Sequence, residues 1–124
     1  MHFLEKEDIL LAHDAILVTT GGHAGILQEG ALDAALERCR WGPFHGEGDL
    51  TERAAYLLRG IVQDHPFVDG NKRTAFEAAA LFFYRNGRLI LAPADEVVSE
   101  MLHAAQGAGV QHIEAWLRRR AEAL

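Results

Sequence analysis

The segment HPFVDGNKRT, residues 65–74, separates two stretches of helical periodicity. Pro66 ends the first helix, because the residue before a proline is pushed away from helical geometry. Asp69 or Asn71 is placed to cap the second helix, which is apolar on nearly every side from residue 75 to residue 84 except at Glu77. The sequence therefore predicts two helices joined by a bend, with His65 at the exit of the first and the second helix at the buried centre.

The rest of the chain also has mainly helical periodicity, which predicts an all-α fold of about six helices. We expect helices over about residues 5–18, 31–40, 49–65, 71–86, from Pro93 to about 106, and from 110 to near the C-terminus. Residues 21–30 contain four glycines and little amphipathic pattern, which predicts a loop with a small flap or hairpin between the first two helices. Residues 88–91 are expected to be briefly extended.

Length and charge narrow the class of protein. The 124 residues are 49% hydrophobic, which suits one domain spanning residues 1–124. With 18 acidic and 12 basic residues, the net charge of -6 disfavours direct nucleic-acid binding.

No apolar run is long enough to cross a membrane and the N-terminus is charged. Cys39 lies on an apolar helical stripe, so we expect it to pack in the core of a cytoplasmic protein.

The start of the second helix carries an unfavourable pair of charges. A helix N-terminus already has partial positive charge, so Lys72 and Arg73 in the first turn cost roughly 0.3–1 kcal/mol each. An anion at this position would reverse that cost, because N–H groups, an ammonium and a guanidinium would then converge on it. Gly70 leaves room for close approach, and Asn71 can orient the loop. The sequence predicts a phosphate site here.

Two further side chains in the loop suggest chemistry on that phosphate. Asp69 places a carboxylate beside the cations, as a Mg²⁺ ion bridging to phosphate oxygens requires. His65 can accept a proton at neutral pH and is the candidate general base. The common nucleotide motifs G-x-G-x-x-G and G-x-x-x-x-G-K-[ST] are absent. The other six histidines show no zinc-binding spacing, so we expect no zinc site and assign them to surface or packing positions.

These residues resemble the signature loop of the Fic and death-on-curing (Fido) superfamily, H-x-F-x-[D/E]-G-N-[G/K]-R, at all nine positions. The resemblance continues over residues 25–36 and 71–87 and covers most of the chain. It implies a helical fold with a small flap, and transfer of part of a nucleoside triphosphate such as ATP to a protein hydroxyl. It also implies that His65 deprotonates the hydroxyl, that Asp69 helps to hold Mg²⁺, and that Gly70, Asn71, Lys72 and Arg73 hold phosphates.

Two positions favour the death-on-curing branch. The adenylylating branch usually has glycine where Lys72 stands and a second arginine where this chain has Phe76. The resemblance then implies a toxin that transfers the terminal phosphoryl group of ATP to a threonine of elongation factor Tu and arrests translation. Two alternatives stay open, an adenylyltransferase and a non-catalytic interaction module on the same scaffold.

The resemblance also implies a protein partner. The inhibitory motif [ST]-x-x-x-[ED]-G, by which some members of the superfamily inhibit themselves, is absent from this sequence. We therefore expect a separate antitoxin, of which a disordered segment folds as a helix into a groove beside the active site.

Overall fold

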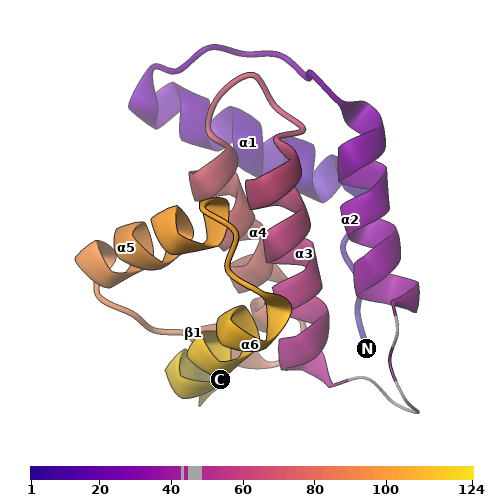
Figure 1. Ribbon diagram of the computed structural model, residues 1–124, viewed down its shortest axis with the longest axis vertical. Coiled ribbons are helices and arrows are strands. Elements are labelled where there is room, and N and C mark those ends of the chain that lie inside the picture. Colours follow the sequence, from indigo (N-terminus) through magenta and orange to yellow (C-terminus); the bar gives the residue numbers. More distant parts are fainter. Residues whose placement is uncertain (43, 45–48) are drawn as a thin grey trace.

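The computed structural model describes residues 1–42, 44 and 49–124, and helices dominate it (Figure 1). In chain order the elements are α1 (Lys6–Thr20), α2 (Glu29–Trp41), α3 (Leu50–Asp64), α4 (Asn71–Arg85), β1 (Arg88–Ile90), α5 (Ala94–Ala105), α6 (Val110–Arg120) and β2 (Ala121–Ala123). The predicted fold of about six helices is therefore confirmed over the described residues. None of these helices has both the length and the apolar character that crossing a membrane would require.

A small antiparallel sheet joins the segment after α4 to the segment after α6. β1 pairs with β2, with Leu89 opposite Glu122. The extended stretch at β1 is as predicted, whereas β2 was not expected, because Ala121, Glu122 and Ala123 are good helix formers. Pairing with β1 supplies their backbone hydrogen bonds instead, which is a long-range effect that local propensity does not record.

Helix α3 occupies the middle of the fold and packs against α2, α4, α5 and α6. The expectation that α4 forms the buried centre is therefore only half right. Helix α4 packs against α1, α3, α5 and the β1 segment, but it exposes Tyr84 near its end. Fully buried side chains from both helices and from α6 fill the interior. They include Leu57, Leu58, Ile61, Val62, Phe82, Phe83, Trp116 and Leu117.

The predicted core position of Cys39 is confirmed. The residue is buried on α2, and this burial raises the pKa of its thiol to about 12. A buried thiol with that pKa is almost entirely protonated at neutral pH and behaves as a small apolar side chain.

The helix starts differ in a way that bears on the site. At α1, Glu5 and Asp8 form a reciprocal capping box. At α3, the Asp49 side chain accepts hydrogen bonds from the backbone N–H groups of Thr51 and Glu52. At α4 the N-cap is Gly70, with φ 78°, and no side chain caps the helix. The prediction that Asp69 or Asn71 caps α4 is therefore wrong, because both side chains are engaged elsewhere in the loop.

Gly60 allows α2 and α3 to approach closely. A Cβ placed on Gly60 would lie 2.7 Å from the Cβ of Ala35 and 3.2 Å from its Cα. The contact is with the backbone region of a neighbouring helix, so a small rotation of a side chain cannot relieve it. Helix α3 must therefore carry a residue without a side chain at this crossing.

We predict that Gly60→Ala lowers the free energy of unfolding by about 1–3 kcal/mol, because α2 must move away from α3. Gly30→Ala is the matched control: Gly30 lies in the first turn of α2 with no atom within 4 Å of the added Cβ. It should leave stability unchanged or raise it by up to about 1 kcal/mol. Urea denaturation of the wild type and both variants measures these changes. Equal denaturation midpoints for Gly60→Ala and Gly30→Ala would contradict the prediction.

Candidate active site

The bend between α3 and α4 begins at His65. This residue has φ 48° and ψ 63° and is the one non-glycine residue with positive φ in the described part of the chain. A side chain in this left-handed conformation costs roughly 1–2 kcal/mol. The bend turns the chain back within residues 65–70 and leaves the His65 side chain exposed. The candidate base is therefore accessible to a substrate.

The side chain of Asn71 holds the loop together. Its Oδ1 accepts a hydrogen bond from the Phe67 N–H at 3.0 Å, and its Nδ2 donates one to the Phe67 carbonyl at 2.9 Å. Both residues are buried, so no water can replace these bonds at low cost. Because the Asn71 side chain is buried and turned toward Phe67, its backbone N–H at the start of α4 is the group better placed to contact a ligand.

His13 of α1 contacts the loop on its buried side, through Phe67 and Asp69. Its ring stacks on that of Phe67, with centroids 3.8 Å apart and planes at 10°. Its Nε2–H donates to the Asp69 carbonyl at 2.8 Å, which fixes the tautomer because a carbonyl only accepts. The Phe67 ring is fully buried. The sequence analysis assigned His13, with the other histidines outside the loop, to a surface or packing position and missed this positioning role.

Asp69 joins the loop to the segment after α1. Its Oδ2 accepts from the His23 N–H at 3.2 Å, and its Oδ1 from the Gly70 N–H at 2.9 Å. These two backbone donors lower the pKa of the Asp69 carboxyl, and the His23 N–H has the larger effect. The carboxyl is therefore ionised at neutral pH. The carboxylate is exposed. Each of its oxygens has lone-pair capacity left for a cation.

The segment between α1 and α2 forms the predicted flap and lies against the loop (Figure 1). Val68 donates to the Gly25 carbonyl at 3.0 Å, and Leu27 donates to the Pro66 carbonyl at 2.8 Å. Ile26 pairs with Phe67 in an isolated antiparallel bridge. The flap residues pair with the loop here, and the structure assigns no strand within the flap itself. Its backbone therefore adds a second layer of support beside Asn71.

An open depression of about 530 Å³ brings all six predicted site residues together. Lys72 and Arg73 are exposed at its edge, and Arg73 Nε lies 3.9 Å from Glu77 Oε1, a long and weak contact. The first turn of α4 contains no acidic residue. The lining residues are Ile16, Thr20, Gly22, His65, Val68, Asp69, Gly70, Asn71, Lys72 and Arg73.

A larger depression, of about 790 Å³, lies near the N-terminus and is less suited to an anion. Its arginines already have acceptors: Arg85 pairs with Asp8 at 2.8 Å, Arg40 Nη2 lies 3.6 Å from Glu5 Oε1, and Arg53 donates to two backbone carbonyls. Among the described residues, the cations at the uncapped start of α4 have only Glu77 as an acceptor, at long range. The depression at the loop is therefore the candidate active site.

Comparison with known proteins agrees with this geometry. The profile of the Fic/DOC family matches residues 3–83. The chain is 36% identical to "Toxin Doc" of Mycolicibacterium smegmatis over 95 residues, 75% of this chain and 71% of that protein. It is 35% identical to "Protein kinase doc" of Escherichia phage P1 over 88 residues, 70% of each chain.

The chain belongs to the Fic/DOC family. Within that family, its similarity to these two relatives supports the Doc branch.

We predict that His65→Gly is more stable than His65→Ala by about 1 kcal/mol, because glycine adopts positive φ without strain. The opposite order is expected at Glu37, an exposed residue within α2, where glycine should be less stable than alanine by about 1 kcal/mol. Urea denaturation of the four variants measures both differences. The same order at the two positions would show that His65 is not strained.

Proposed function

We propose that this protein is the toxin of a type II toxin–antitoxin pair and that it transfers the γ-phosphoryl group of ATP to a threonine hydroxyl of elongation factor Tu. The observation that carries the proposal is the uncapped, positively charged start of α4, which shares one depression with the exposed His65. The names of the two relatives, a toxin and a protein kinase, support the same function.

Phosphate binding follows from the start of α4. A helix leaves its first N–H groups without intrahelical acceptors, and here no side chain accepts them as Asp49 does at α3. The N–H groups of the first turn, the helix dipole, Lys72 and Arg73 together favour an anion. Gly70 has φ 78°, a conformation that favours glycine, and a Cβ added there would face the His13 ring at 3.6 Å. A triphosphate fits this arrangement.

The residues present also fit Mg²⁺. Asp69 is exposed and ionised, and each of its oxygens accepts only one backbone N–H. Carboxylate and phosphate oxygens are the ligands that Mg²⁺ prefers. A Mg²⁺ ion on Asp69 would neutralise part of the phosphate charge. The carboxylate would otherwise repel the triphosphate, so Asp69 is expected to act through the metal.

In the proposed reaction, a ring nitrogen of His65 accepts the proton of the acceptor hydroxyl as its oxygen attacks the γ-phosphorus. The bond from the γ-phosphorus to the bridging oxygen breaks, and ADP leaves. Lys72, Arg73 and the N–H groups of α4 stabilise the charge on the phosphate oxygens. The hydrogen bonds of Asn71 and His13 keep the loop rigid, so these groups need little rearrangement.

Two positions favour phosphoryl over adenylyl transfer. Phe76 is partly buried and its ring lies 6.2 Å from that of Trp116, so position 76 offers no cation to a phosphate. Lys72 lines the depression and adds bulk and charge there. With a lysine at position 72 and no cation at position 76, we expect bound ATP to place its γ-phosphate, and not its α-phosphate, next to His65.

The test uses ATP labelled at either the α- or the γ-phosphate, with purified elongation factor Tu and Mg²⁺. We predict label on elongation factor Tu from γ-labelled ATP only, because only the transferred group marks the target. His65→Ala should lower the rate by roughly 10²–10⁴-fold. His2→Ala, at an exposed residue outside the depression, is the control and should keep full activity. Transfer of α-label would establish adenylyl transfer instead, and absence of both labels would contradict the proposed target.

We predict that Lys72→Gly impairs γ-phosphoryl transfer while changing the free energy of unfolding by no more than about 1 kcal/mol, since the residue is exposed. Lys72→Met keeps the length of the side chain and removes its charge. A loss in both variants assigns the effect to the charge, and a loss in glycine alone assigns it to the bulk. Unchanged transfer in Lys72→Gly would contradict a role for this residue.

The proposed partner is an antitoxin whose disordered segment folds as a helix beside the active site. Ile26, Leu27 and Val68 expose apolar side chains on the flap and the loop, where such a helix would find a contact. Both the antitoxin and elongation factor Tu would place the protein in the cytoplasm. Co-expression with the protein encoded beside it should restore growth, and the two proteins should co-purify.

A further inference from the structure

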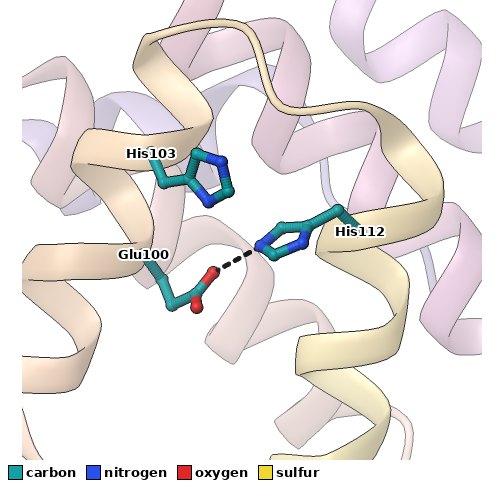
Figure 2. A group of neighbouring side chains, drawn as sticks. All are labelled: Glu100, His103 and His112. Atoms are coloured by element: carbon teal, nitrogen blue, oxygen red, sulfur yellow. Dashed lines mark hydrogen bonds and ion pairs between the residues drawn. The ribbon is translucent and has the colours of Figure 1, made fainter.

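A second cluster of potential ligands lies between α5 and α6 (Figure 2). Glu100, His103 and His112 each offer one ligand atom, and these atoms all lie within 4.8 Å of one another. His112 Nε2 is 3.1 Å from Glu100 Oε2, and the two imidazole rings have centroids 4.5 Å apart. None of the three residues lines the candidate active site.

Local structure brings these three residues together. Glu100 and His103 stand three apart on α5 and so share one face of the helix. The chain then reverses through residues 106–109, where Gly107 has φ 111°, and α6 presents His112 from its first turn. Figure 2 shows both imidazole rings and the carboxylate directed into the space between the two helices. The sequence search missed the cluster because it sought all ligands at close spacing.

Helices α5 and α6 also contact each other through Glu96, near the start of α5. Trp116 Nε1 donates to Glu96 at 2.7 Å, and Arg120 forms an ion pair with the same carboxylate. Glu96 and Glu100 are thus one turn apart on α5 and both face α6. These contacts hold the two helices in register, so the cluster is supported by elements that are already positioned against each other.

The chemistry of the set matches zinc. Two imidazoles and one carboxylate, with water as the fourth ligand, form a known tetrahedral arrangement for Zn²⁺. Ligand atoms about 2.0 Å from such an ion lie roughly 3.3 Å apart, and the Glu100–His112 distance of 3.1 Å is already close to that. His103 is exposed, so its side chain can move the remaining distance by a rotation. An ion pair between Glu100 and His112 alone makes no use of the His103 nitrogens.

We propose that Glu100, His103 and His112 bind Zn²⁺ and that the ion fastens the start of α6 to the end of α5. The side chain of Glu100 is 20% exposed and that of His112 41%, so the site is half open and can accept an ion from solution. The ion would join the two helices through three protein ligands and leave its fourth position to water. The site does not depend on the proposed reaction, because the candidate active site is built from α1, the flap, the loop and the start of α4.

The test titrates Zn²⁺ into full-length protein that carries no histidine tag and has been dialysed against a chelator. We expect one equivalent to bind by calorimetry and to raise the Tm. His103→Ala should weaken binding at least 10-fold and abolish the rise in Tm, and its exposed position should leave the fold intact. His2→Ala, at another exposed histidine, is the matched control and should bind as the wild type does.

Two further measurements separate a metal site from a simple ion pair. Glu100→Gln keeps a hydrogen-bonding oxygen but removes the charge, and should weaken Zn²⁺ binding in the same way. Substitution with Co²⁺ should give the intense visible absorption of a four-coordinate site, and His112→Ala should remove it. Absence of stoichiometric binding, or equal binding by His103→Ala and the wild type, would overturn the proposal, including the case in which Zn²⁺ binds at His65 and Asp69 instead.

Discussion

The paired hydrogen bonds between the Asn71 side chain and the Phe67 backbone are the constraint on which the candidate active site depends. They close the loop between α3 and α4 on itself and fix where His65, Asp69 and the start of α4 lie. A buried backbone N–H and carbonyl need partners, and a single carboxamide satisfies both. Its two atoms can do this because a side-chain amide presents one donor group and one acceptor, as a peptide unit does.

Using Asn71 in this way leaves α4 without a cap. Helices α1 and α3 satisfy N–H groups of their first turns with acidic side chains. Helices α2, α5 and α6 also begin without a side-chain cap, but none of them carries a lysine or arginine in its first turn as α4 does. The Asp69 carboxylate accepts the N–H groups of His23 and Gly70 and so does not cap α4. Positive potential therefore remains at the mouth of the depression, where Lys72 and Arg73 add to it. The loop is held by its own hydrogen bonds, while the N–H groups and cations at the start of α4 leave a net positive potential facing solvent. An anion-binding site requires such a potential.

Much of this could be predicted from the sequence, because it rests on local signals. Helical periodicity predicts the six helices, Pro66 ends α3, and the run of residues 65–74 places the six site residues in one bend. The parts that escaped prediction depend on distant contacts. Those are the pairing of β1 with β2, the stacking of His13 beneath Phe67, and the meeting of His103 with His112. Capping at α4 was wrongly predicted because Asn71 and Asp69 had two available uses, and only the folded loop selects between them.

The backbone N–H of His23 ties the flap to the carboxylate of Asp69, which lines the depression. Gly22 has no side chain at this contact, and a Cβ there would come within 2.8 Å of the Asp69 Oδ2. A cation bound to that oxygen would compete with the N–H group that His23 donates to it. Occupation of the Asp69 carboxylate and the contact between the flap and the loop are therefore coupled.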